Sequence, residues 1–115
     1  MLIRSQNREV LIDLNSMAGT EIAEGPIKTI ITSYITGCSY LLGEYSDKAK
    51  AMKVLDMIQE AYADTELILM TVPNIGKMFT EAPASKENEL LAEAISKVIM
   101  NKMVFQMPED SEVEV

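Results

Sequence analysis

The most constraining feature of this sequence is a change in the spacing of its apolar residues at Ser46. Before Ser46, apolar and β-branched residues form short runs or alternate with polar ones, and glycine, proline and asparagine bound these runs. After Ser46, apolar residues recur every three or four positions. A period of two is typical of strands and a period near 3.6 is typical of helices. The chain therefore predicts an α+β fold, with strands first and helices second.

Residues 1–45 are predicted to form an antiparallel sheet of four to five strands. The stretches LIRS and VLIDLN flank the polar turn QNRE, and TEIAE is a short strand that Gly25-Pro26 ends. IKTIITSYIT is rich in β-branched residues, which pack well on a pleated surface. It should form a hairpin with CSYLLGEY, whose tip is either Thr36-Gly37 or Gly37-Cys38.

An amphipathic helix is predicted over residues 46–70, with Ser46 as its N-cap and Asp47 in its first turn. It should end by Pro73, because proline disfavours helical geometry in the residue before it. Whether the apolar run LILMTV stays helical is left open by the sequence. The apolar stripe that should pack on the sheet consists of Ala51, Val54, Leu55, Ile58 and Tyr62.

A second helix is predicted over residues 86–102, with Ser85 as its N-cap. Its apolar stripe is wider than one sheet face needs, so we expect it to pair with another copy in a homo-oligomer. That stripe consists of Leu90, Leu91, Ile95, Val98 and Ile99. The run VFQM suggests a last short strand. Residues 1–108 should form a single domain, and residues 109–115, with four acidic side chains, an acidic flexible tail.

Composition excludes several kinds of function. Ten basic residues among 18 acidic ones, with a net charge of −8, argue against direct binding to nucleic acid. The chain has no histidine, and its single cysteine, Cys38, allows neither an intrachain disulfide nor a thiolate zinc site. It has no glycine-rich nucleotide motif, no signal peptide pattern and no apolar run long enough for a membrane span. We therefore expect no enzyme activity, metal, cofactor or membrane partner. The single cysteine also fits a protein that works in a reducing cytoplasm.

Binding chemistry remains for a few residues. Arg4 and Arg8 are the only arginines, and a guanidinium group suits phosphate or carboxylate. Side-chain amides could read the polar edge of a ligand, and a phenylalanine ring could stack on a base. Turn and core roles remain open for Gln6 and Phe105. The candidate ligand-binding residues are Arg4, Gln6, Arg8, Phe79, Phe105 and Gln106.

Three stretches of the chain resemble a group of short proteins from phages and prophages of Gram-positive bacteria. The stretches are LIRSQN…LIDL, LLGEYSDKAKAMKVLDMIQEAY and VFQMPEDSEVE. Proteins of that group tend to share an opening I-R-S-Q-[DN], a central L-G-x-Y-S-x-x-x-[KR]-A-x-x-V-L-D-x-I and a closing V-F-Q-M-P. Residues 67–102 lie outside these blocks and look like a variable insertion. The resemblance implies a small phage protein that works in the cytoplasm of a host bacterium.

Small non-catalytic phage proteins of this size often counter host defence, which gives the first expectation for function. The chain would be a viral sponge that sequesters a cyclic nucleotide immune signal, in a pocket often closed between protomers. One alternative is an acidic inhibitor of a host defence protein, such as an anti-CRISPR that imitates nucleic acid. Another is a phage accessory or structural protein.

Overall fold

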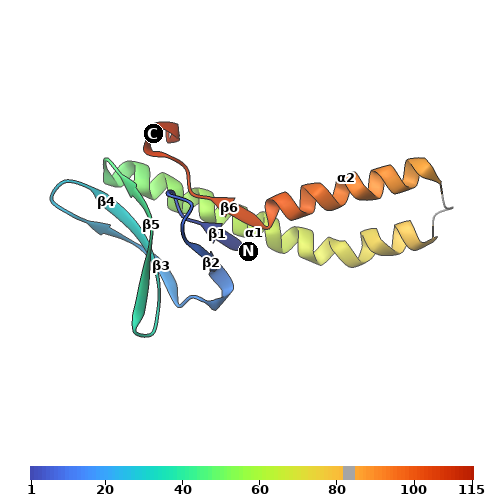
Figure 1. Ribbon diagram of the computed structural model, residues 1–115, viewed down its shortest axis with the longest axis horizontal. Coiled ribbons are helices and arrows are strands. Elements are labelled where there is room, and N and C mark those ends of the chain that lie inside the picture. Colours follow the sequence, from blue (N-terminus) through green and yellow to red (C-terminus); the bar gives the residue numbers. More distant parts are fainter. Residues whose placement is uncertain (82–84) are drawn as a thin grey trace.

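The computed structural model of the protein describes residues 1–81 and 85–115, and for Ile75, Phe79 and Thr80 it describes the backbone alone. These residues form a mixed α+β structure with two helices and two three-stranded sheets (Figure 1). The strands are β1 (Leu2–Arg4), β2 (Leu11–Asp13), β3 (Gly19–Glu24), β4 (Thr29–Ile35), β5 (Cys38–Tyr45) and β6 (Val104–Gln106), and the helices are α1 (Lys48–Glu81) and α2 (Lys86–Lys102). The prediction of one sheet of four to five strands within residues 1–45 is wrong.

The first sheet has the order β2-β1-β6 and joins the two ends of the chain. β1 pairs antiparallel with β2 across a tight turn, and parallel with β6, so that Ile3 lies opposite both Ile12 and Phe105. A parallel pair needs a long connection, and here the connection is the rest of the protein. The single-sheet prediction failed because β1 takes its second neighbour from beyond the helices and not from β3.

The second sheet is an antiparallel meander with the order β3-β4-β5. Ile35 pairs with Cys38, so Thr36-Gly37 is the tip of the predicted hairpin. Gly37 has a φ of 78°, a conformation that glycine adopts without steric cost. The sequence left two possible tips, and the pairing register selects the first.

The first half of α1 supplies the helical side of the core. Ala51, Val54 and Ile58 are buried against the sheets, as the apolar spacing predicted, and Leu55 and Tyr62 are half-buried beside them. The predicted N-cap is one residue too early. The backbone N–H of Lys50 donates to Oδ1 of Asp47 at 2.8 Å, so Asp47 caps the helix. α1 begins at Lys48, which places Asp47 at the cap position, and the N–H of Ser46 donates to Oδ1 of Asp110.

α1 does not end at residue 70 but continues through Pro73 to Glu81. Proline removes one N–H···O=C bond and crowds the preceding turn, which disfavours a helix without forbidding it. Here Pro73 is exposed, and α2 packs along the same segment, so tertiary contacts outweigh the local preference. α2 occupies the predicted range, and Ser85 caps it by accepting a bond from the N–H of Asn88.

The second half of α1 and α2 form an antiparallel hairpin that extends away from both sheets (Figure 1). The hydroxyl of Thr65 donates to the carbonyls of Ala61 and Lys102, which fixes the base of this hairpin. The molecule measures 61 × 32 × 22 Å and its radius of gyration is 17.7 Å, against about 13 Å for a compact chain of similar length. In the described residues, neither helix is long and apolar enough to cross a membrane.

The C-terminal segment packs against the body of the protein. Met107 and Val113 are buried in the core, and Asp110–Glu112 form a short 3-10 helix beside the start of α1. The sequence predicted a flexible acidic tail from residue 109. The structure differs because Val113 packs into the core and Lys50 pairs with Asp110. Both partners are distant in sequence, so the composition of residues 109–115 alone could not predict these contacts.

Candidate binding site

The sheet β2-β1-β6 brings Arg4 and Gln106 together although 101 residues separate them. The two residues are register partners on β1 and β6, and register partners on neighbouring strands point to the same side of a sheet. Ile3 and Phe105, one position earlier on each strand, form a pair on the other side, where Ile3 is fully buried. Arg4 and Gln106 therefore lie on the outer face of this sheet.

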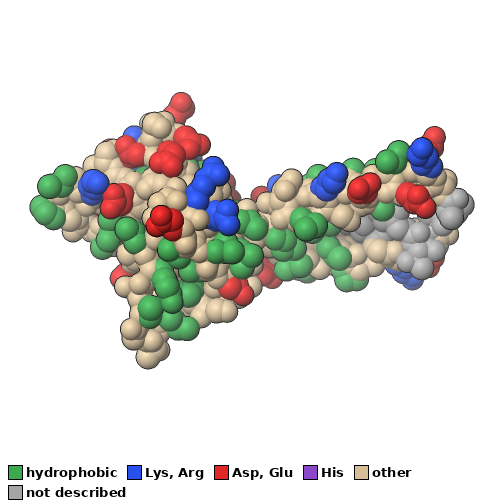
Figure 2. Space-filling view, viewed as in Figure 1, with side chains coloured by type: hydrophobic (Ala, Val, Ile, Leu, Met, Phe, Trp, Pro, Cys, Tyr) green, Lys and Arg blue, Asp and Glu red, His purple; other side chains and the backbone are tan. Residues whose placement is uncertain are grey.

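This outer face combines charge with apolar surface. Its members are Leu2, Arg4, Leu11, Asp13, Val104 and Gln106. Leu11 and Val104 are 50% and 41% exposed on either side of Arg4. Figure 2 shows basic side chains beside hydrophobic ones near the middle of the molecule. All four ion pairs of the described residues use lysines, so the guanidinium groups of Arg4 and Arg8 remain available to an anion.

Arg8 is placed by the turn that joins β1 to β2. It is exposed and has a φ of 67°, which is uncommon for a residue with a side chain. The turn is held by Asn7, whose Oδ1 accepts bonds from the hydroxyl of Ser5 and the N–H of Glu9. The polar stretch Ser5-Gln6-Asn7-Arg8 thus forms a tight turn with Arg8 at its tip.

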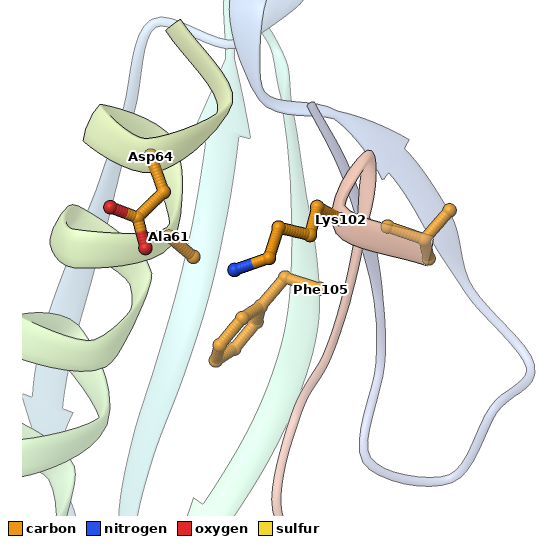
Figure 3. A pocket seen from close by; sticks show the side chains of 5 residues that line it. Ala61, Asp64, Lys102 and Phe105 are labelled. Carbon is orange, nitrogen blue, oxygen red and sulfur yellow. The ribbon is translucent and has the colours of Figure 1, made fainter. Parts of the chain in front are cut away.

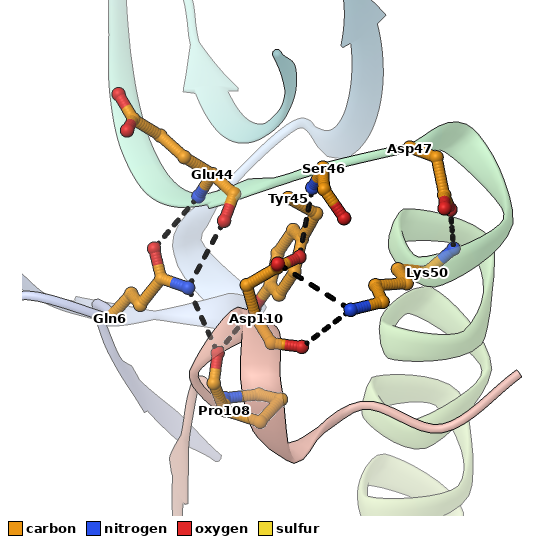
Figure 4. A network of polar contacts seen from close by, with 8 residues as sticks. All are labelled: Gln6, Glu44, Tyr45, Ser46, Asp47, Lys50, Pro108 and Asp110. Carbon is orange, nitrogen blue, oxygen red and sulfur yellow. Dashed lines mark hydrogen bonds and ion pairs between the residues drawn. The ribbon is translucent and has the colours of Figure 1, made fainter.

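Gln6 is engaged inside the protein. Its Nε2 donates to the carbonyls of Glu44, at 3.1 Å, and Pro108, at 3.2 Å, while its Oε1 accepts from the N–H of Glu44 at 2.9 Å (Figure 4). Both amide hydrogens are used, so none is left for a ligand. Gln6 joins β1, β5 and the C-terminal segment, a role that the sequence did not predict.

Gln106 is also held by the backbone. Its Nε2 donates to the carbonyls of Ser5 and Met107, each at 3.0 Å, which leaves only its Oε1 to accept a bond from a ligand. The amide is therefore fixed beside Arg4 and presents an acceptor.

Phe105 lies apart from the arginines. It is half-buried and lines a small hollow of about 170 Å³ with Ala61, Asp64, Lys102 and Val104 (Figure 3). Ligand pockets usually enclose about 300 to 1,000 Å³, so this hollow is small for a nucleotide. The side chain of Phe79 lies outside the described residues.

A larger hollow of about 410 Å³ opens where the C-terminal segment meets β5 and α1. Its lining consists of Gln6, Ile27, Lys28, Glu44, Tyr45, Ser46, Glu109 and Asp110. The three carboxylates outnumber the single lysine, so the hollow disfavours an anionic ligand.

The polar network beneath this hollow is structural (Figure 4). The Tyr45 hydroxyl donates to the Pro108 carbonyl at 2.9 Å, and burial, reinforced by the negative charge of nearby acids, raises the pKa of Tyr45. Asp110 accepts from the N–H of Ser46 at 2.8 Å and pairs with Lys50, and the bond from Ser46 lowers the pKa of Asp110 despite some desolvation. Sequence reasoning missed this network because its partners lie 60 or more positions apart.

Other chemistry finds little support in the part of the chain that the structure describes. No three acidic or thiol side chains converge there as a metal site requires, and Cys38 is exposed beside the hairpin tip. Comparisons with protein-family models, with curated proteins and with solved structures found no match to this chain. Among the described residues, the outer face with Arg4 and the adjoining turn with Arg8 therefore form the candidate binding surface.

Proposed function

We propose that the protein is a non-catalytic phage protein that counters host defence by sequestering a cyclic nucleotide signal in the bacterial cytoplasm. The observation that supports this proposal is the pair of guanidinium groups, Arg4 and Arg8, that have no anionic partner among the described residues. A guanidinium group offers a phosphate two parallel hydrogen bonds and a full charge. The ordered Oε1 of Gln106 adds an acceptor beside Arg4.

The proposal includes a homo-oligomer. Nucleotide sites usually bury most of their ligand, whereas the outer face of a single chain is open. A second protomer, part of which lies beside this face, would supply the missing wall. In this proposal Phe105 supports the sheet from its inner side and does not stack on the ligand.

A panel of cyclic di- and mononucleotides, with linear nucleotides as controls, tests the proposal by thermal shift and calorimetry. We expect one cyclic nucleotide to bind tightly and to be released chemically unchanged when the protein is denatured. Replacing Arg4 or Arg8 by alanine should weaken binding by about 10- to 150-fold, because a hydrogen bond to a charged group is worth about 1.5 to 3 kcal/mol.

Lys53→Ala is the matched control for these variants. Lys53 is an exposed cation on α1 and forms no ion pair among the described residues, so its loss changes the net charge equally. An unchanged affinity in this variant would separate a local contact from a general charge effect. A full panel without any thermal shift would remove the nucleotide proposal.

A second candidate is favoured by the exposed apolar side chains of the outer face. Leu11 and Val104 flank Arg4 on an open surface, and interfaces are enriched in arginine with apolar neighbours. A host protein could bind there, and the protein would then be an inhibitor or a phage accessory protein. Purified host defence proteins with an acidic binding surface should bind the wild type and lose affinity for Leu11→Asp.

A further inference from the structure

Part of the far half of α1 carries no charge on any side of the helix. Residues 67–76, LILMTVPNIG, include no charged side chain. Leu67 and Met70 share one side of the helix and Val72 points to another, and the three side chains are 62%, 75% and 37% exposed. A helix that is hydrophobic all round is normally buried on every side, and α2 covers one side only. This segment therefore lacks part of its cover in the single chain.

α2 shows the same deficit. None of its residues is buried, and Leu91 and Val98 are more than half exposed. On one side of the hairpin, the two helices form a shallow groove of about 260 Å³. We call this side the hairpin face, and its members are Ile68, Thr71, Leu91, Ala94, Ile95 and Val98. Figure 2 shows hydrophobic side chains gathered along the hairpin near its base.

We propose that the hairpin faces of two copies of this chain pack against each other in antiparallel orientation and form a four-helix bundle. The inference rests on the homo-oligomer that the proposed function includes, and it names the surface and the arrangement. A four-helix bundle gives each α1 a second helical neighbour and covers the apolar groove.

The sequence of α2 supports the antiparallel arrangement. Residues 87, 91, 94, 95, 98 and 102 share one stripe, and their spacing is the same when it is counted from either end. When two copies cross between Ala94 and Ile95, Glu87 of one copy lies opposite Lys102 of the partner subunit, at both ends of the stripe. Neither residue forms an ion pair within the described chain. The α2 stripes of two antiparallel copies are thus complementary in charge.

The position of α1 agrees with the same two-fold axis. The bond from Thr65 to the carbonyl of Lys102 places these two residues side by side, and Ile68 lies beside Ile99 in the groove. Equal steps along both helices from this pair bring Val72-Pro73 level with Ala94-Ile95. An axis at that level sets Leu67 against Met78 of the partner subunit. It also sets Asp64 opposite Glu81 of the partner subunit at the two ends of the α1 stripe, a like-charge pair, so charge complementarity comes from α2 alone. One axis therefore serves both helices, as a closed dimer requires.

The area is sufficient for such a contact. A 17-residue helix is about 25 Å long at 1.5 Å per residue, and two helices side by side are about 20 Å wide. The face then covers roughly 500 Å² per protomer, or about 1,000 Å² in the dimer, which is the lower bound for a specific interface.

Sedimentation or light scattering at micromolar concentration gives the first test. The wild type should have twice the chain mass of 12.8 kDa. Val98→Glu, which buries a carboxylate in both halves of the contact, should raise the dissociation constant at least 100-fold. Met100→Glu is the control, because Met100 is 69% exposed on the opposite side of α2 and should leave the dimer unchanged.

Charge reversal tests the orientation. Glu87→Lys and Lys102→Glu should each raise the dissociation constant about tenfold, and the double variant should restore it to within threefold of the wild type. A parallel dimer would place Glu87 opposite its own copy, so each single variant would still give like charges and the double variant would show no rescue. A monomeric wild type at 100 µM, an intact Val98→Glu dimer, or a double variant without rescue would overturn the inference.

Two measurements keep this inference separable from the proposed function. Far-UV circular dichroism and thermal unfolding establish that each variant is folded, and if Val98→Glu is not, the charge-reversal set carries the test. Arg4→Ala should remain dimeric even where it loses nucleotide binding. A nucleotide panel without binding on an intact dimer would count against the function alone.

Discussion

Replacing Gln6 by alanine should destabilise the protein more than the substitution of a polar residue near the surface usually does. The side chain makes three hydrogen bonds of 2.9 to 3.2 Å to groups on two other segments of the chain. The substitution would leave the N–H and carbonyl of Glu44 without these partners, while the carbonyl of Pro108 would keep its bond from Tyr45. The loss therefore falls mainly on the junction between β1 and β5.

The size of this loss follows from the number of bonds. One intramolecular hydrogen bond contributes about 0.5 to 1.5 kcal/mol net, and three give roughly 1.5 to 4.5 kcal/mol. Glu44 is only half-buried, so water can reach part of the vacated site and the lower end applies. We expect a loss of about 2 kcal/mol in the free energy of unfolding, which corresponds to a melting temperature lower by about 8 °C.

Urea unfolding at one fixed protomer concentration measures this value, because oligomerisation makes apparent stability depend on concentration. Gln59→Ala is the matched control, since Gln59 is exposed on α1 and forms no side-chain hydrogen bond in the described residues. A Gln6→Ala variant within about 0.5 kcal/mol of this control would refute the structural role and return Gln6 to the candidate ligand contacts.

Three further changes test the packing of the C-terminal segment and the start of α1. Tyr45→Phe should lower the free energy of unfolding by about 1 kcal/mol near neutral pH, because the bond to Pro108 is lost. Since the pKa of Tyr45 is raised in the folded protein, the stability that its hydroxyl contributes is complete below pH 10.0 and should fade above it. The difference in urea midpoint between wild type and variant should therefore shrink from pH 9 to 11. Asp110→Asn should make the free energy of unfolding less dependent on pH in the acid range. The lowered pKa of Asp110 in the folded protein gives stability that is present above the usual value of 3.8 and is lost as the pH falls below it. Equal slopes of unfolding free energy against pH in wild type and variant would contradict this. Asp47→Ala should cost about 1 kcal/mol of helix capping, and Asp47→Ser should recover most of it in the same unfolding assay.

Local patterns in the sequence predicted those parts of the fold that depend on near neighbours. The hairpin around Gly37, the Ser85 cap and the buried stripe of Ala51, Val54 and Ile58 each rest on residues within a few positions. Turn conformation, capping and periodicity act over this range, so the residues alone were sufficient.

The missed features all depend on distant partners. The neighbour of β1 is β6, the segment after Pro73 is held helical by α2, and the acidic end is held by Lys50 and the core around Val113. For the candidate site, residue chemistry selected Arg4 and Gln106, and their register shows them adjacent. The same chemistry could not show that the Gln6 amide is engaged by Glu44 and Pro108, because that bond depends on how the two sheets meet.

The parallel pairing of β1 with β6 also bears on how the protein folds. The strands of the second sheet and the helical hairpin involve contacts close in sequence, so they can form early and quickly. β1 has one partner nearby and must wait for the other until residue 106 has been synthesised. We therefore expect the first sheet to close last. Pulse-labelled hydrogen exchange should show amide protection appearing in β4, β5 and α1 before it appears in β1.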